Sequence, residues 1–237
     1  MTSRTYKRTS VEIINLNHLA IIMDGNRRWA KKNKLKTNLG HKKGIDNSIA
    51  ILKSINNDRS IKIKYITLYV FAENNWKRPA SEISSLFNFI VQTYNKFEEL
   101  SLREDFKIKH FGSKKRLPKS IINIIENVQN RTNKNRGIQI NLAFNYSGRT
   151  EIIKAIEKLI ADKQNINKFE SNLYSNNIPD PDLIIRTGGE HRISDFLLWQ
   201  SAYSELFFTK TLWPEFRFTQ LKKSLYNYLK RKRNYGK

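Results

Sequence analysis

The residues best suited to chemistry stand together near the start of the chain, where an apolar run ends in Asp24 and continues as Gly25, Asn26, Arg27 and Arg28. The apolar run predicts a buried strand, and parallel sheets bind their ligands at the carboxyl ends of such strands. Gly25 and Asn26 tolerate positive φ, so their N–H groups can point into one concavity at the start of a following helix. Such a concavity suits an anion.

The arginines and the carboxylate indicate which anion this is. Arg27 and Arg28 carry fork-shaped donors that match phosphate oxygens, and Asp24 can hold a Mg²⁺ that bridges to the same phosphate. An ordinary strand–turn–helix with a capping Asx turn explains any one of these residues, but not their conjunction. We therefore expect a diphosphate substrate.

A second group of charged residues lies in 182–195. A short apolar strand ends in Arg186, a glycine pair frees the backbone, and Arg192 and Ser194 supply further donors. Two arginines and a hydroxyl around a flexible turn predict a second anion pocket. His191 has no accompanying ligands, so it is interpreted as a structural or surface histidine.

Two further polar features accompany these groups. Glu205 is embedded in the apolar segment 197–208, and an acid so placed needs a partner, which is usually a metal or an arginine. A polar loop over 72–79 follows the strand expected at 61–71. This loop therefore also falls at the carboxyl edge of a strand.

The elements that must position these residues alternate between strands and helices. Strands separated by helices imply parallel crossovers, so the sequence predicts a single α/β domain with a largely parallel central sheet wrapped by helices on both faces. This domain spans 18–237 and follows a mobile basic arm over 1–17. We expect strands at about 18–24, 61–71, 106–112 and 138–144, a short helix and loop over 26–38 that ends at Gly40, and helices at about 45–55, 81–97, 118–131 and 147–161.

The helix that begins at Ser81 carries a wide apolar stripe, which includes Leu86 and Phe97. Phe89 and Val91 widen it beyond what one sheet face can cover. A cavity for an apolar ligand accounts for this stripe, and a buried central helix or a dimer contact accounts for it about as well.

Composition and charge narrow the choices further. The 237 residues are 39% hydrophobic, enough for one large core, and include no Cys, which excludes disulfides, thiolate nucleophiles and cysteine metal sites. No apolar run approaches the ~18 residues of a membrane span, so we expect a cytoplasmic protein. The net charge of +23 favours a phosphorylated substrate, an anionic membrane surface or nucleic acid. Simple solvation explains the charge of the basic tail equally well.

Six separated motifs follow one another along the chain: IMDGNRRWA, GHKKG, NWKRP, NLAFNYSGR, IRTGGEHRISDFLLWQ and AYSELFF. Together they resemble the cis-prenyltransferases of the undecaprenyl diphosphate synthase family, from about His18 to Gly236. The resemblance implies a homodimer with an apolar tunnel. It also implies Mg²⁺-dependent condensation of isopentenyl diphosphate with an allylic diphosphate, in particular farnesyl diphosphate. The product would be a long polyprenyl diphosphate such as undecaprenyl diphosphate, a lipid carrier precursor for cell-wall synthesis.

The resemblance also assigns roles to residues. It assigns Mg²⁺ to Asp24 and to Glu205, the latter across the dimer interface. It links Asn75 to the proton step, and because an amide is a poor base we expect Asn75 to orient a water or the substrate diphosphate. The implied substrate contacts are Gly25, Asn26, Arg27, Arg28, Trp29, Thr37, His41 and Arg78 for the allylic diphosphate, Arg186, Arg192, Ile193 and Ser194 for isopentenyl diphosphate, and Ala72, Glu73, Asn74 and Trp76 in the polar loop.

Three segments depart from the family pattern. The polar loop usually reads FS[S/T]ENW but here reads FAENNW, so Ala72 lacks a hydroxyl and the acid is displaced to Glu73. Any proton relay through that serine cannot operate. Thr37 stands where an arginine commonly grips the allylic diphosphate, and Lys36 offers only a less specific point charge. The tail reads RNYG where RRFG is usual.

Two other functions stay open as alternatives. A catalytically inert family member that stabilises an active partner tends to lose the acid and arginines of the first loop, which are present here. Nucleic-acid binding is motivated by charge alone, without a recognition helix or an aromatic RNA-binding signature. We expect no nucleic-acid partner, and peripheral contact with an anionic membrane at the inner face of the plasma membrane. The length of the product depends on packing around Val70, Leu86, Phe89 and Leu142.

Overall fold

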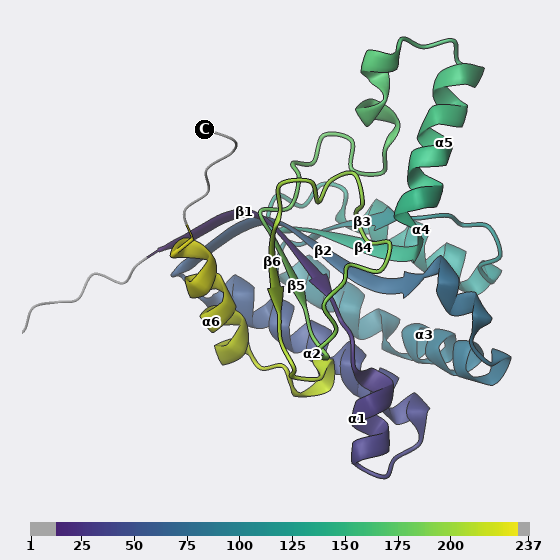
Figure 1. Ribbon diagram of the computed structural model, residues 1–237. Coiled ribbons are helices and arrows are strands. Elements are labelled where there is room, and N and C mark those ends of the chain that lie inside the picture. The colour runs from purple at the N-terminus through teal and green to yellow at the C-terminus, as the bar shows by residue number, and fades with distance from the viewer. Residues whose placement is uncertain (1–12, 232–237) are drawn as a thin grey trace, which may run out of the picture.

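A six-stranded parallel sheet forms the centre of the computed structural model, which describes residues 13–231 (Figure 1). The strand order is β3-β4-β2-β1-β5-β6, and every neighbouring pair is parallel. The strands are β1 (Ile14–Ile22), β2 (Ile61–Ala72), β3 (Lys107–Phe111), β4 (Gln139–Tyr146), β5 (Leu183–Arg186) and β6 (Glu205–Phe208). The helices are α1 (Asn26–Lys32), α2 (Thr37–Asn57), α3 (Ala80–Arg103), α4 (Lys119–Thr132), α5 (Gly148–Ala161) and α6 (Phe218–Leu229), with 3₁₀ turns η1 (Glu73–Lys77), η2 (Ile166–Lys168), η3 (Glu170–Asn172) and η4 (Trp213–Glu215).

The two faces of the sheet are covered differently, although the predicted fold class is confirmed. On one face, α2, α3, α4 and α6 pack side chains such as Leu52, Val128 and Leu225 against the strands. On the other face, Phe196 and Leu197, from the irregular connection between β5 and β6, provide the cover where helices were expected. Helix α5 projects from the body together with η2 and η3 (Figure 1). No helix within residues 13–231 is long and apolar enough to cross a membrane.

Strand β1 begins earlier than the sequence suggested. Ile14 and Leu16 are buried, and residues 14–16 pair with 61–63 of β2, so this segment belongs to the sheet and not to a mobile arm. The rest of the predicted arm, residues 1–12, lies outside the described part of the chain, and Ile13 is exposed.

Helix α2 also begins earlier, at Thr37, so that Gly40 and His41 are helical and not part of a loop. A Cβ at Gly40 would lie 2.2 Å from the carbonyl oxygen of Asn26. Glycine at this position therefore permits close packing of α2 against the start of α1, where the sequence suggested a helix break.

A row of buried polar side chains crosses the middle of the sheet. His18 Nε2 lies 2.7 Å from Thr67 Oγ1, and Asn141 Nδ2 donates to the same oxygen at 3.0 Å. Burial lowers the pKa of His18 to about 4, so its imidazole is neutral in the folded protein at pH 7.

The register of the sheet gathers the functional segments at one edge. Ile22, at the end of β1, is opposite both Tyr69 of β2 and Arg186 of β5. The residues that follow these three strands therefore meet at the carboxyl edge, as the parallel arrangement predicted.

Candidate active site

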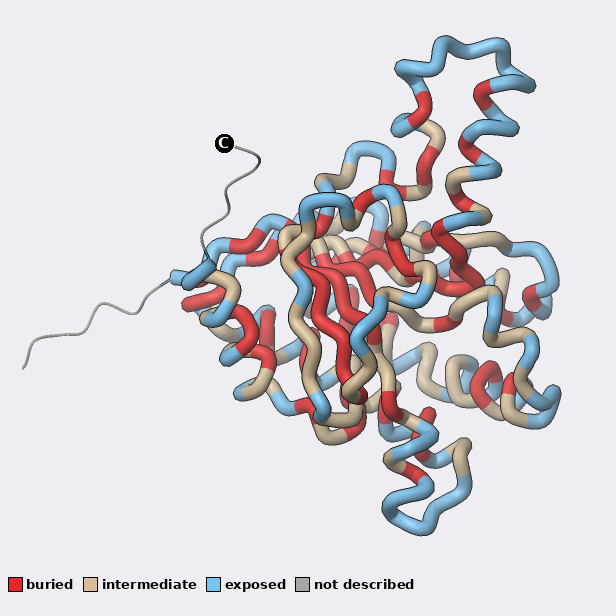
Figure 2. The backbone as a smooth tube through the Cα atoms, in the orientation of Figure 1, coloured by how far each residue is buried: buried red, intermediate tan, exposed pale blue. Residues whose placement is uncertain are grey.

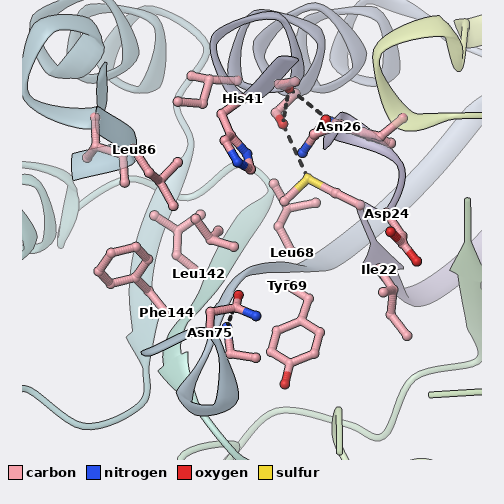
Figure 3. Close-up of a pocket in the computed structure, with 18 of the residues that line it drawn as sticks. Ile22, Asp24, Asn26, His41, Leu68, Tyr69, Asn75, Leu86, Leu142 and Phe144 are labelled. Atoms are coloured by element: carbon pink, nitrogen blue, oxygen red, sulfur yellow. Dashed lines mark hydrogen bonds between the residues drawn. The ribbon is translucent and has the colours of Figure 1, made fainter. Parts of the chain in front are cut away.

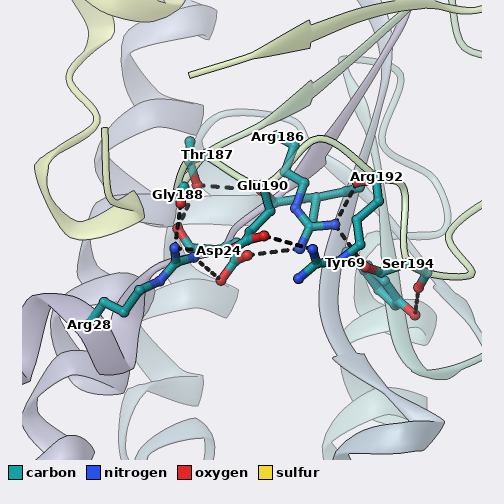
Figure 4. A network of polar contacts seen from close by, with 10 residues as sticks. Asp24, Arg28, Tyr69, Arg186, Thr187, Gly188, Glu190, Arg192 and Ser194 are labelled. Carbon is teal, nitrogen blue, oxygen red and sulfur yellow. Dashed lines mark hydrogen bonds and ion pairs between the residues drawn. The ribbon is translucent and has the colours of Figure 1, made fainter. Parts of the chain in front are cut away.

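Asp24 lies just beyond β1, with its carboxylate between two arginines (Figure 4). Its Oδ2 accepts from Arg186 Nη2 at 2.9 Å, and its Oδ1 lies 3.1 Å from Arg28 Nη2. Burial alone would raise the pKa of Asp24, but the hydrogen bond from Arg186 and the charge of Arg28 lower that pKa below its ordinary value. The carboxylate is therefore ionised at neutral pH, and 30% of the side chain is still exposed.

Arg186 is almost fully buried, with 5% of its side chain exposed. Its Nη1 donates to the carbonyl oxygen of Arg192 at 2.5 Å and to Ser194 Oγ at 2.7 Å. Its Nε–H has no partner among the described residues. A buried guanidinium with a donor to spare is suited to an anion.

Arg192 is far more exposed than Arg186. It is 61% exposed and forms an ion pair with Glu190 at 2.6 Å, so Arg192 stands at the rim, and its backbone carbonyl is what touches Arg186. Glu190 also lies 3.3 Å from Arg28, so one acid ties together residues from the two predicted anion pockets. The two pockets are therefore adjacent parts of one site.

Two glycines allow the backbone to approach this site. Gly25 has φ +113°, as its sequence context predicted, whereas Asn26 is the first residue of α1. Gly188 has φ +88°, and a Cβ there would lie 2.6 Å from Arg28 Nη2. Any side chain at position 188 would therefore displace the arginine from Asp24.

On another side of the site, Arg27, Arg78 and His41 surround Glu82, an acid that the sequence analysis did not single out. Glu82 Oε1 lies 3.1 Å from His41 Nε2 and accepts from Arg78 Nη1 at 3.3 Å, and its other oxygen lies 3.8 Å from Arg27 Nε. Burial lowers the pKa of His41, which favours the neutral imidazole. Glu82 was missed because a first-turn acid is ordinary in any helix.

The polar loop forms η1 at the end of β2. Asn75 Oδ1 accepts from the backbone N–H of Ala72 at 3.1 Å, and Asn75 lines the cavity (Figure 3). The displaced acid, Glu73, accepts from Thr150 Oγ1 at 2.7 Å and so ties η1 to the start of α5. Trp76 packs edge-on against Phe71 and Phe87 and is not a lining residue.

Several of these groups line the mouth of a cavity of about 1020 Å³, part of which Figure 3 shows: Asp24, Arg27, Arg28, His41, Asn75, Arg78, Arg186 and Ser194. Beyond the mouth the cavity runs between the sheet and helices α2, α3 and α4, and most of its wall residues are apolar. Three of the four predicted wall residues line it, and Phe89 does not. The apolar wall includes Ile49, Leu52, Leu68, Val70, Leu86, Ile90, Phe97, Ile125, Val128 and Leu142.

Comparison with known proteins agrees with this architecture. The family model described as "Putative undecaprenyl diphosphate synthase" matches residues 22–236. The chain belongs to this family. The isoprenyl transferase of Clostridium tetani is 42% identical, covering 92% of this chain and 88% of that protein, and the isoprenyl transferase of Treponema denticola is also 42% identical, covering 93% and 97%.

Solved structures give the same result. Lavandulyl diphosphate synthase from Lavandula x intermedia, in complex with dimethylallyl diphosphate, superposes with a TM-score of 0.88 at 31% identity, covering 94% of this chain and 99% of that one. A probable undecaprenyl diphosphate synthase from Campylobacter jejuni gives a TM-score of 0.77 at 29% identity, covering 94% and 99%. The chain is a prenyltransferase, and its family membership supports cis-prenyl chain elongation.

In this prenyltransferase Glu205 lies at the amino end of its strand and not at the mouth. It begins β6 and is level with Leu183 at the start of β5, about three strand residues or 10 Å from the carboxyl edge. Its carboxylate pairs with Arg231 at 2.5 Å. One chain therefore cannot bring Asp24 and Glu205 to the same ion, and within residues 13–231 no cluster of three or more acids and histidines could hold one.

The remaining predicted residues divide into two sets. Ala72, Asn74 and Ser194 line the cavity, whereas Trp29, Thr37 and Ile193 do not. The sequence analysis missed several polar lining residues, among them Tyr69, Arg149 and Asp195. Tyr69 looked like part of an apolar strand, and only its pairing with Ile22 shows that it reaches the site.

Proposed function

We propose that this prenyltransferase condenses isopentenyl diphosphate with an allylic diphosphate, in particular farnesyl diphosphate, to a long polyprenyl diphosphate such as undecaprenyl diphosphate. The observation that carries the proposal is an apolar cavity of about 1020 Å³ opening at a mouth built from arginines. Such a cavity matches an amphiphile with an anionic head and a hydrocarbon tail. An allylic diphosphate is an amphiphile of this kind.

The arrangement of the mouth favours two diphosphates side by side. Arg27, Arg28 and the N–H groups at the start of α1 would hold the allylic diphosphate, with His41 and Arg78 beside it. Arg186 and Ser194 would hold isopentenyl diphosphate, with Arg192 closing the rim. Asp24 lies between the two groups, because it contacts both Arg28 and Arg186.

The residues present fit a Mg²⁺ ion bound together with substrate. Mg²⁺ is usually held by one or two carboxylates plus phosphate oxygens, and Asp24 supplies an ionised, partly exposed carboxylate at the mouth. When bound, the metal would neutralise the departing diphosphate. Arg28 and Arg186 would stabilise the same developing charge from fixed positions.

In the reaction, the bond from allylic C1 to the diphosphate oxygen breaks, C4 of isopentenyl diphosphate bonds to C1, and a proton leaves C2. Asn75 would orient a diphosphate or a water through its amide N–H groups, because its oxygen already accepts from Ala72. Asn75 is therefore a positioning residue in this proposal. In this proposal the departing diphosphate is the base that accepts the proton from C2.

We also propose that the enzyme is a homodimer whose interface includes the open edge at β6 and the apolar stripe of α5. Exposed apolar side chains occur on α5, on β6 and on the connection that precedes β6: Ile153, Ile156, Ile160, Trp199, Tyr203 and Leu206. Such an interface would carry Glu205 toward the partner's cavity mouth, which one chain cannot do for itself.

Mixing Asp24→Asn and Glu205→Gln chains tests this shared site, because a hybrid dimer has one site with both carboxylates. Recovered turnover in the mixture supports the shared site, and an absence of turnover refutes it.

The activity is tested with farnesyl diphosphate, labelled isopentenyl diphosphate and MgCl₂, followed by sizing of the labelled product. Asp58→Asn is a matched control for Asp24→Asn, because Asp58 pairs with Lys222 and does not line the cavity. We expect elongated product from the native chain and from Asp58→Asn. Absence of any elongated product from the native chain would refute the proposal.

A further inference from the structure

A basic projection with exposed leucines stands beside the cavity mouth. Residues 31–43, here called the α1–α2 tip, contain six lysines and no acid. Leu35 and Leu39 within the tip are 41% and 40% exposed. The tip extends beyond the sheet at the lower end of the molecule, and most of it is exposed (Figures 1 and 2).

The charge of the tip is largely uncompensated. Lys32 lies 3.2 Å from Glu215, but Lys31, Lys34, Lys36, Lys42 and Lys43 form no ion pair with a described acid. All five are exposed. A single exposed leucine needs no explanation, but here one leucine in the α1–α2 connection and one in the first turn of α2 are both exposed among unpaired lysines, which makes the tip both apolar and cationic.

We propose that the α1–α2 tip docks the enzyme on an anionic lipid surface. Lysines would contact the headgroups, and Leu35 and Leu39 would enter the acyl boundary. Nucleic acid shares the negative charge of such a surface, but it offers nothing to exposed aliphatic side chains, and its single strands are bound by stacking on aromatic rings. The two leucines therefore favour lipid.

The position of the tip would place a docked bilayer close to the cavity mouth. Helix α1 supplies Arg27 and Arg28 to the cavity mouth and continues directly into the tip. A bilayer at the tip would therefore lie next to the mouth. This step rests on the proposed function, since a polyprenyl product leaving the mouth would pass into lipid without exposing its whole tail to water.

Co-sedimentation of the full chain with vesicles tests the proposal without turnover, so its failure is separate from failure of the proposed activity. Vesicles of phosphatidylcholine with 30% phosphatidylglycerol are compared with phosphatidylcholine alone. The test variant is Lys31→Gln/Lys34→Gln/Lys43→Gln. The matched control is Lys115→Gln/Lys119→Gln/Lys134→Gln, which removes the same charge from exposed positions in and beside α4.

We expect binding to the anionic vesicles only. Each lysine near such a surface strengthens binding about fivefold, so the tip variant should bind about 100-fold more weakly, and the control within a few-fold of the native chain. Leu35→Asn/Leu39→Asn should weaken binding about tenfold with the charge unchanged. Equal losses in the tip variant and the control would overturn the proposal. So would a chain that ignores vesicles but binds single-stranded RNA through the same lysines.

Discussion

Replacing Asp24 with Asn keeps the shape of the side chain and removes the charge between Arg28 and Arg186. The bond to buried Arg186 is charge-assisted and worth about 1.5–3 kcal/mol, whereas the pair with half-exposed Arg28 adds at most about 1 kcal/mol. We expect the free energy of unfolding at pH 7 to fall by about 2–3 kcal/mol. The folded pKa of Asp24 is lowered, so this stabilisation is complete above the unfolded pKa of about 3.9 and disappears as pH falls through the folded value.

The same substitution should move turnover and anion binding in opposite directions. Turnover should fall about 10³-fold or more, because the proposed metal donor is gone. Metal-free binding of inorganic pyrophosphate should tighten about fivefold, since a negative charge that repels the ligand is removed. Two unit charges 4 Å apart in water interact by about 1 kcal/mol, which sets that scale.

Urea unfolding, calorimetric titration and the turnover assay test these expectations. Urea unfolding at pH 7 and pH 3 gives the stability difference, which should shrink at pH 3. Calorimetric titration of pyrophosphate with EDTA or with MgCl₂ gives the two affinities, and Mg²⁺ should strengthen binding only to the native chain. Weaker metal-free binding by Asp24→Asn would show that Asp24 does not compete for the arginines. Turnover within a few-fold of native would show that Asp24 does not hold the metal.

Three further outcomes follow from particular side chains. Arg186→Ala should raise KM for isopentenyl diphosphate and also lower the free energy of unfolding by about 2–4 kcal/mol. Arg192→Ala removes an exposed pair, so it should raise the same KM and keep the free energy of unfolding within about 0.5 kcal/mol of native. Similar stability losses of the two variants in urea would contradict this. Because the pKa of His18 falls to about 4 on folding, native stability should be complete above pH 6.5 and decline by at most about 3 kcal/mol toward pH 4; unfolding of His18→Gln across that range should show a flatter slope. Val128→Phe, on the apolar wall, should shorten the product, and an unchanged chain length on product sizing would place Val128 outside the path of the tail.

Much of the mouth was predictable because parallel strands have a fixed direction. Asp24 and Arg186 each follow an apolar run, and such runs end at one edge of a parallel sheet. Their location at one edge could therefore be predicted from two segments more than 160 residues apart, but the sequence analysis assigned them to two pockets and did not predict their contact. Glu205 shows the limit of this reasoning: its apolar neighbours indicated an acid in need of a partner, but not that it begins β6 and so lies at the other end of the sheet.

Other features depended on packing that a sequence pattern does not contain. Gly40 reads as a helix breaker, and only the approach of Asn26 to α2 explains a glycine inside that helix. Glu82 and Tyr69 have side chains common in ordinary helices and strands, and tertiary pairing alone brings them to the site. The cavity itself was one of three explanations for the stripe on α3, and the packing of α2, α3 and α4 distinguishes among them.

The polar mouth and the apolar body of the cavity are built from separate parts of the fold. The mouth rests on the ends of β1 and β5 and on the start of α1, while the walls of the body come largely from α2, α3 and α4. A substitution deep in the helices can alter the apolar space and leave the arginines of the mouth in place. Evolution can therefore change the product without passing through an inactive enzyme, so one scaffold can give rise to synthases of many chain lengths.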